Sequence, residues 1–245
     1  MNAGKKIVVL GCGESGYGSA VLAKVKGFDV FLSDSGKIPE RFSAILDHYA
    51  IPYEQGGHTS ELIMSASEVV KSPGIPDSAP LVRALREHGI PVISEIEFAG
   101  RFTKGHTICI SGSNGKTTTT TLAYNILQEA GYDVGLAGNI GVSFAYSVAT
   151  SDKDWYVMEL SSFQLDGMTD FRADISVLLN ITPDHLDRYD YDFDKYADSK
   201  MRLLNNQRSD DYFIYWGEDK VIPAKLSLLR PESHLLPFSV CEGQN

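Results

Sequence analysis

At Thr107-Ile-Cys-Ile-Ser111-Gly-Ser-Asn-Gly115-Lys-Thr117, a short apolar run leads into a glycine-rich turn that ends in Gly-Lys-Thr. The run is typical of a buried strand, and Leu122, Ala123, Ile126 and Leu127 follow at helical spacing. In such a turn, main-chain N–H groups converge on phosphate oxygens, the lysine supplies a positive charge and the threonine can ligate Mg2+. The stretch therefore predicts a strand, a nucleotide-phosphate site and a helix.

The predicted phosphate loop has seven residues: Gly112, Ser113, Asn114, Gly115, Lys116, Thr117 and Thr118. It departs from the longer form of the motif, because Ile110 stands where that form has its first glycine. The alternative interpretation is a flexible turn with a solvated lysine. That alternative does not explain the apolar strand before the turn.

Composition narrows the class of protein. A net charge of -10 over 245 residues argues against nucleic-acid binding, which needs a basic surface. The three cysteines, Cys12, Cys109 and Cys241, are far apart and form no Cys-x-x-Cys pattern, which indicates reduced thiols in a cytoplasmic protein. Neither an 18-residue apolar run nor a signal peptide is evident, so we expect no membrane insertion.

The amino-terminal region contains a second glycine-rich turn. The apolar run Ile7–Leu10 precedes Gly11-Cys-Gly13-Glu-Ser-Gly16, and Asp34 ends the next strand about twenty residues further on. This pattern is the dinucleotide fingerprint, but any nucleoside diphosphate can use the same cradle. NAD(P), another phosphorylated ligand and a purely structural turn therefore all remain open.

Strands and helices alternate along the chain, which predicts α/β architecture with mostly parallel, doubly wound sheets. Ser72-Pro-Gly74 closes a strand at the edge where open α/β sheets bind ligands. We place the domain boundary after Ile93, giving a Rossmann-like domain over residues 1–93 and a P-loop domain over 94–245. The second domain begins with a linking helix over Ser94–Phe102, capped by Ser94.

Two further strands of the second domain end in polar residues. Trp155–Met158 leads into Glu159, and Ile175–Leu179 leads into Asn180-Ile-Thr-Pro-Asp-His185. An acid in the position of Glu159 holds Mg2+ or orients water in many phosphate-loop proteins, although it can also be a solvated strand end. Because parallel strands end at one edge of a sheet, we expect these residues to share one site.

Lys200 is predicted on the buried stripe of a helix, seven residues after Phe193. A buried lysine costs desolvation unless it is paired or its pKa falls. The resulting neutral amine could react with CO2 to give a metal-binding carbamate. Periodicity alone favours the alternative, a lysine that snorkels to the helix edge.

Four segments together resemble the Mur ligases: Ser111-Gly-Ser-Asn-Gly-Lys-Thr117, Gly138-Asn-Ile-Gly141, Glu159-Leu-Ser-Ser-Phe-Gln-Leu165 and Asn180-Ile-Thr-Pro-Asp-His-Leu-Asp-Arg-Tyr189. The third segment is similar to the MurD type of that family. The resemblance covers the whole chain, including Ser72–Gly74. It implies ATP-dependent addition of D-glutamate to UDP-N-acetylmuramoyl-L-alanine during peptidoglycan precursor synthesis, through an acyl phosphate.

The resemblance also implies residue roles. A first group would bind the UDP substrate: Gly13, Glu14, Ser15, Asp34, Ser35, Ser72, Pro73 and Gly74, with Asn139, Ser161 and Gln164 orienting its muramoyl-alanine portion. Lys116, Glu159, His185 and Lys200 would be catalytic. Of two Mg2+ ions, Thr117 and Glu159 would ligate one, and His185 and a carbamylated Lys200 would ligate the other. This reverses the snorkelling preference for Lys200.

Family members have a third domain that holds the amino acid, and this chain ends without one. The resemblance therefore implies a truncated central domain and a monomeric protein that binds the UDP substrate but does not ligate. The alternatives are a Mur-type ligase for another amino acid, a non-catalytic UDP-sugar-binding module and an NAD-dependent dehydrogenase. The dehydrogenase would leave Lys116, Glu159 and His185 without a role.

We accordingly expect the chain by itself to bind UDP-N-acetylmuramoyl-L-alanine and to show negligible ligation, because the amino-acid site is largely missing. Isothermal titration measures the first expectation and a phosphate-release assay the second. Robust turnover that depends on D-glutamate would show that the additional domain is not needed.

Overall fold

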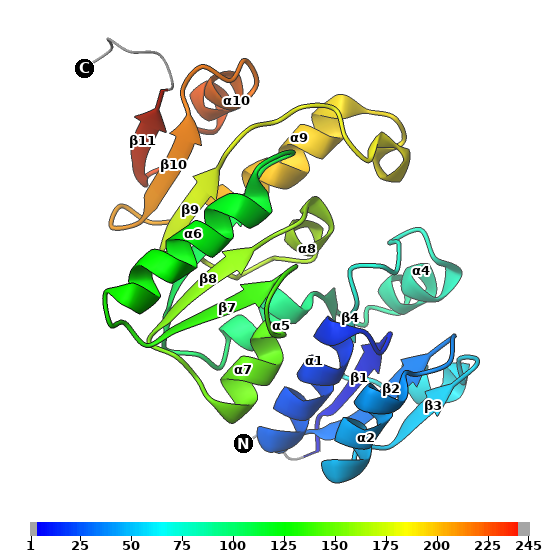
Figure 1. Ribbon diagram of the computed structural model, residues 1–245. Coiled ribbons are helices and arrows are strands. Elements are labelled where there is room, and N and C mark those ends of the chain that lie inside the picture. The colour runs from blue at the N-terminus through cyan, green and yellow to red at the C-terminus, as the bar shows by residue number, and fades with distance from the viewer. Residues whose placement is uncertain (1–3, 240–245) are drawn as a thin grey trace. The chain divides into compact units, whose positions relative to one another are not determined.

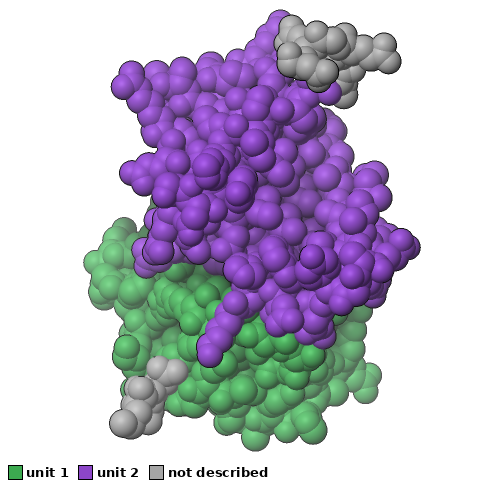
Figure 2. All heavy atoms as spheres, turned by 90° about the vertical axis from the view of Figure 1, so that its left-hand side faces the viewer, with its two compact units in different colours: residues 1–103, 142–152, 167–169 green, residues 104–141, 153–166, 170–245 purple. Residues whose placement is uncertain are grey.

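The computed structural model describes residues 4–239, so Cys241 lies outside the described residues. The chain forms two compact units, coloured separately in Figure 2. Unit 1 contains the residues up to 103 together with 142–152 and 167–169, and unit 2 contains 104–141, 153–166 and the residues from 170 onward. Each unit has its own sheet.

Unit 1 is built on five parallel strands in the order β3-β2-β1-β4-β5 (Figure 1). Its elements are β1 (Lys6–Leu10), α1 (Glu14–Val25), β2 (Asp29–Asp34), α2 (Glu40–His48), β3 (Tyr53–Gln55), α3 (Ser60–Met64), β4 (Glu68–Lys71), α4 (Pro80–Glu87), β5 (Val92–Ile93), α5 (Glu95–Gly100) and α7 (Phe144–Thr150). The strand order reverses between β1 and β4, which makes their carboxyl ends the edge where such sheets bind ligands. The predicted doubly wound fold is confirmed.

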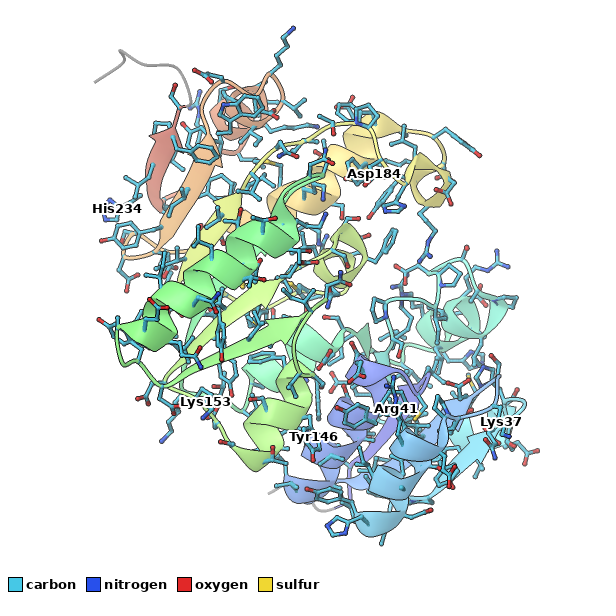
Figure 3. The ribbon with its side chains drawn as sticks, viewed as in Figure 1. Lys37, Arg41, Tyr146, Lys153, Asp184 and His234 are labelled. Carbon is cyan, nitrogen blue, oxygen red and sulfur yellow. The ribbon has the colours of Figure 1, made fainter. Side chains whose placement is uncertain are left out.

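The apolar residues of β1 are buried in the core of unit 1. Ile7, Val8, Val9 and Leu10 are at most 2% exposed, as expected for a parallel strand covered on both faces. Helix α1 packs on β1, β2 and β4. Tyr146 of α7, labelled in Figure 3, lies edge-on to Tyr17 of α1, so α7 belongs to the same core.

The predicted linking helix forms as α5, and the Ser94 Oγ caps it by accepting a hydrogen bond from the Glu97 N–H. It lies in unit 1, although the expected boundary placed it in the second domain. The physical reason is a pair of buried carboxylates. Glu95 accepts hydrogen bonds from the Ser143 hydroxyl and the Ala145 N–H, and Glu97 accepts one from the Thr169 N–H. These bonds hold distant segments of the chain in unit 1.

Unit 2 is built on six parallel strands in the order β11-β10-β9-β6-β8-β7 (Figure 1). Its elements are β6 (His106–Ser111), α6 (Lys116–Glu129), β7 (Val134–Gly138), β8 (Trp155–Glu159), α8 (Ser162–Asp166), β9 (Ile175–Leu178), η1 (Leu186–Tyr189), α9 (Phe193–Met201), η2 (Arg202–Leu204), β10 (Tyr212–Trp216), α10 (Ile222–Leu229) and β11 (His234–Phe238). Helix α6 packs on β6, β7 and β8.

This strand order sets the position of the site. Strand β6 lies between β9 and β8, and β7 is the next strand beyond β8. The residues at the carboxyl ends of these four strands therefore meet at one edge of the sheet: Asn180, the turn from Gly112 to Gly115, Glu159 and Asn139. Within residues 4–239, no helix combines the length and apolarity needed to cross a membrane.

Replacing Glu95 with alanine is expected to destabilise unit 1, because the Ser143 hydroxyl and the Ala145 N–H would lose their acceptor. Each buried unsatisfied group costs about 1–3 kcal/mol, so we expect a clear fall in the urea midpoint. Glu95→Gln, which keeps an acceptor oxygen, should be milder. Glu87→Ala, at an exposed position on α4, is the control. Equal midpoints for Glu95→Ala and Glu87→Ala would contradict this account of the core.

Candidate functional site

The turn after β6 has the conformation of an anion cradle. Gly115 has a φ of 82°, in the left-handed region that favours glycine, and is the N-cap of α6. The first helical hydrogen bond runs from the Thr119 N–H to the Gly115 carbonyl. The N–H groups of Lys116, Thr117 and Thr118 therefore precede the helical ladder and point out of the helix end, where a phosphate can accept from them.

Lys116 folds back over this turn. Its Nζ donates to the carbonyl oxygens of Gly112 at 2.9 Å and Ser113 at 3.0 Å. These are neutral acceptors, and a phosphate oxygen is a stronger one because it is charged. The positive charge of Lys116 therefore lies directly at the mouth of the turn.

Glu159 at the end of β8 is 1% exposed, and both of its carboxylate oxygens are engaged. One accepts the Thr117 hydroxyl at 2.7 Å, and the other accepts the Asn139 side-chain amide at 2.8 Å. Thr117, Glu159 and Asn139 are thus brought together at one edge of the sheet. The Thr117 hydroxyl and the Glu159 carboxylate are hard oxygen donors of the kind that Mg2+ prefers.

Lys200 lies in the same site and does not snorkel. It is 2% exposed, its Nζ donates to the Gly112 carbonyl at 2.9 Å, and the ammonium lies 4.8 Å from the ring centre of Tyr196. Burial, followed by the positive charge of Lys116, lowers the pKa of Lys200 to about 7; Asp184 and Asp166 partly oppose this shift. A large fraction of Lys200 is therefore a neutral amine at neutral pH.

The His185 side chain is more exposed than those of Glu159 and Lys200. Its side chain is 61% exposed, with Nε2 3.6 Å from Oδ2 of Asp184, and its ring faces that of Phe163. Asp184, labelled in Figure 3, belongs to the loop that follows β9. In residues 4–239, no group of three or more His, Cys, Asp and Glu side chains is arranged to hold a metal ion. The role of His185 as a metal ligand stays a prediction.

Ser161 and Gln164 form a capping box at the start of α8. The Gln164 Oε1 accepts from the Ser161 N–H and hydroxyl, and the Ser161 Oγ accepts from the Gln164 N–H. This local role accounts for the Ser-x-x-Gln spacing by itself. The expected contact of both residues with a substrate stays a prediction.

In unit 1, the glycine-rich turn after β1 is tightly built. A Cβ at Gly16 would lie 1.9 Å from the Gly11 carbonyl oxygen, so only glycine allows this approach. Gly13 is the N-cap of α1, and the Ser72 hydroxyl donates to Gly11. The turn thus places the helix N-terminus, which includes Glu14 and Ser15, beside the end of β4, where Pro73 and Gly74 follow.

Asp34 is used differently from the acid of a dinucleotide-binding site. One of its oxygens accepts the Cys12 N–H at 2.6 Å and the other accepts the Gly36 N–H at 2.7 Å, across Ser35. In dinucleotide-binding folds, the corresponding acid hydrogen-bonds the ribose hydroxyl. Here the carboxylate fixes the two loops of the cradle to each other, which weighs against NAD. Burial raises the pKa of Cys12 to about 12, so its thiol is no nucleophile.

Sequence reasoning assigned no individual role to three residues that shape the phosphate loop: Asn180, Thr182 and Tyr196. The Asn114 main chain pairs with the Asn180 side chain, and the Ser113 hydroxyl contacts both the Thr182 main chain and the Tyr196 hydroxyl. For Asn180 and Thr182, the sequence signal was the cluster of polar residues after the strand Ile175–Leu179, whereas Tyr196 lies in α9, outside that cluster. These residues contact the phosphate loop because β9 lies next to β6 in the sheet, and the sequence does not give that strand order.

A turn of this kind between a parallel strand and a helix, with a buried acid at the end of the neighbouring strand, is the arrangement of a P-loop domain of the α/β class. Comparison with known families identifies the group. Residues 110–242 match the Mur ligase middle domain, and residues 5–94 match the Mur ligase MurD-like N-terminal domain. The chain belongs to the Mur ligase family, as its sequence motifs predicted.

Curated relatives point to one type within the family. The chain is 60% identical to the UDP-N-acetylmuramoylalanine--D-glutamate ligase of Bacteroides fragilis, over 98% of this chain and 54% of that protein. It is 56% identical to the ligase of the same name from Porphyromonas gingivalis, over 96% of this chain and 52% of that protein. The chain thus spans about half the length of these relatives.

Solved structures agree on the fold. The UDP-N-acetylmuramate:L-alanyl-gamma-D-glutamyl-meso-diaminopimelate ligase (MPL) of Neisseria meningitides aligns with a TM-score of 0.66 at 22% identity, over 94% of this chain and 76% of that one. MurC of Thermotoga maritima aligns with a TM-score of 0.57 at 20% identity, over 89% of this chain and 50% of that one. At these identities the likeness shows the architecture alone.

The lowered pKa of Lys200 predicts a pH-dependent stability. Between the folded value of about 7 and the ordinary value of 10.5, the unfolded state binds more protons than the folded state. The free energy of unfolding of the wild type should therefore rise from pH 7 to 10.5 relative to that of Lys200→Met. The free energy of unfolding of Lys200→Met should exceed that of the wild type by the largest amount below pH 7. Parallel urea titrations at several pH values measure this, and a pH-independent difference would contradict the burial of a charged Lys200.

Proposed function

We propose that unit 2 binds MgATP as part of a ligase that joins D-glutamate to UDP-N-acetylmuramoyl-L-alanine. The observation that carries this proposal is the convergence of Lys116, Thr117, Glu159 and Lys200 on the turn that begins at Gly112. The names of the curated relatives support the choice of substrates. We place the enzyme in the cytoplasm, where nucleotide-linked precursors and ATP are available.

The phosphate loop residues would act on the β- and γ-phosphates of ATP. The N–H groups at the start of α6 would donate to phosphate oxygens, and Lys116 would exchange its two carbonyl acceptors for them. Charged acceptors form hydrogen bonds roughly twice as strong as neutral ones. The exchange is therefore favourable and needs only a rotation of the lysine side chain.

Thr117 and Glu159 fit one Mg2+ ion, because their oxygens already face each other at 2.7 Å. When bound, the ion would neutralise charge on the phosphates and so allow a carboxylate to approach. Asn139 holds the other Glu159 oxygen, so the carboxylate keeps its orientation when Thr117 turns toward the ion.

Lys200 would act as a carbamate. The neutral amine attacks CO2, a C–N bond forms, and one proton leaves to water, which changes a neutral amine into an anion. The low pKa of Lys200 supplies the neutral amine at neutral pH. The anion would lie beside Lys116, which favours its formation. With His185 it would form a second Mg2+ site, after movement of the exposed imidazole toward it.

The reaction would then proceed in two steps. The carboxylate of UDP-N-acetylmuramoyl-L-alanine attacks the γ-phosphorus of ATP, so that an acyl phosphate forms and ADP leaves. The amine of D-glutamate attacks the acyl carbon, and amide, phosphate and one proton are released. The turn in unit 1 around Gly13, with Asp34 and Ser72, would hold the uridine diphosphate. We further propose that the 245 residues alone do not ligate, since the relatives are about twice as long.

Lys116→Met should weaken MgATP binding by at least about tenfold, because a charged hydrogen bond to phosphate contributes about 1.5–3 kcal/mol. Lys195→Met, which removes an exposed lysine that forms an ion pair with Asp190 on the surface of unit 2, is the control. Isothermal titration with MgATP measures both variants. Affinities equal to that of the wild type for both would refute the phosphate site.

A further inference from the structure

The phosphate loop is attached to the residues that follow β9. The Ser113 N–H donates to the Asn180 main-chain carbonyl at 3.0 Å. The Asn114 N–H donates to the Asn180 Oδ1 at 2.9 Å, and the Asn180 Nδ2 donates to the Asn114 carbonyl at 3.1 Å. One side chain thus pairs with both main-chain groups of a single loop residue.

The side-chain amide of Asn180 makes the kind of hydrogen-bond pair with Asn114 that the main chain of an adjacent strand would make. It offers one acceptor and one donor side by side, as the main chain of an adjacent strand does. Aspartate would keep the acceptor and lose the donor, and alanine would lose both. We call this pair of hydrogen bonds the Asn180 clamp.

A second set of contacts, which does not involve the Asn180 side chain, also holds the phosphate loop near β9. The Ser113 hydroxyl donates to the Thr182 carbonyl, accepts from the Thr182 N–H and lies 3.0 Å from the Tyr196 hydroxyl. At Gly112, an added Cβ would lie 3.0 Å from the Cβ of Leu179. These contacts fix the position of Ser113, whereas the clamp fixes the peptide groups on either side of Asn114, directly before the left-handed Gly115.

The clamp also decides which N–H groups an anion can reach. Those of Ser113 and Asn114 are already paired with Asn180, on the β9 side of the loop. Those of Lys116, Thr117 and Thr118 lie ahead of the first helical hydrogen bond and are available. The cradle is therefore formed by the start of α6, although the sequence motif also includes Ser113 and Asn114.

We propose that Asn180 is a positioning residue, which presets the phosphate loop for polyphosphate binding by holding both main-chain groups of Asn114. The proposal rests on the proposed phosphate-binding function. The Asn180 amide pairs through both of its polar atoms with Asn114, so it would act through Asn114 on the orientation of Gly115 and of the helix end that follows. Without the clamp, the loop must be ordered at the expense of binding energy.

Amide hydrogen exchange tests the clamp without any nucleotide. In Asn180→Ala, the Asn114 amide should exchange about tenfold faster than in the wild type, since its acceptor is gone. The Ser113 amide should change little, because its acceptor is the main chain of residue 180. In Asn180→Asp, the Asn114 amide should keep most of its protection. An unchanged Asn114 rate in Asn180→Ala, or equal acceleration at Ser113 and Asn114, overturns the clamp.

Titration with MgATP and MgADP then tests positioning. Asn180→Ala should bind both nucleotides about tenfold more weakly than the wild type, which corresponds to about two neutral hydrogen bonds. The matched control is Asn125→Ala, which removes an exposed amide from α6. Affinities of Asn180→Ala within twofold of those of the control overturn the positioning role. A wild type that binds neither nucleotide instead overturns the proposed function, and the exchange rates still decide the clamp.

Discussion

Two ammonium groups, those of Lys116 and Lys200, donate to one main-chain oxygen, that of Gly112. Because each nitrogen lies 2.9 Å from that oxygen, the two nitrogens are at most about 6 Å apart. Like charges at this separation oppose each other, and the burial of Lys200 adds a desolvation penalty. When both lysines are protonated, two positive charges therefore share this single neutral acceptor. A polyphosphate would relieve their repulsion, and so would conversion of the Lys200 amine into an anion.

The sheet brings together charged side chains that are far apart in the sequence. Lys116 follows β6, Glu159 ends β8, and Lys200 comes from α9, whose Tyr196 contacts the phosphate loop through Ser113. All strand pairs in unit 2 are parallel, so every strand presents its carboxyl end on the same side. The close approach of the loop to β9 further requires a small residue at Gly112.

Much of this arrangement could be predicted from local sequence. A strand with a continuous apolar run and the capped linking helix were predicted within about two residues of their observed ends, Trp155–Glu159 and Glu95–Gly100. The short elements β3 and α3 were not predicted, because segments of three to five residues show too little periodicity. Lys116, Thr117 and Glu159 could be placed together because each follows a recognisable pattern, whereas Lys200 was assigned to the site only through the resemblance to the Mur ligases.

The rest of the site depends on tertiary contacts. Asn180 can clamp the phosphate loop only because β9 is the neighbour of β6, although β7 and β8 separate them in sequence. The burial that decides between a neutral and a snorkelling Lys200 comes from packing around α9, which periodicity does not determine. Likewise, Asp34 fits the fingerprint of a ribose-binding acid, yet its oxygens face two N–H groups of the protein itself.

The buried carboxylates of Glu95 and Glu97 have a consequence for biosynthesis. Because they hold Ser143, Ala145 and Thr169, unit 1 needs residues that are translated after the whole of β6, α6 and β7. A ribosome that has released only the first hundred residues has therefore produced helix α5 before the donors Ser143, Ala145 and Thr169 of its two glutamates exist. The two units must mature together on the emerging chain, and neither can be separated from the other by a single cut.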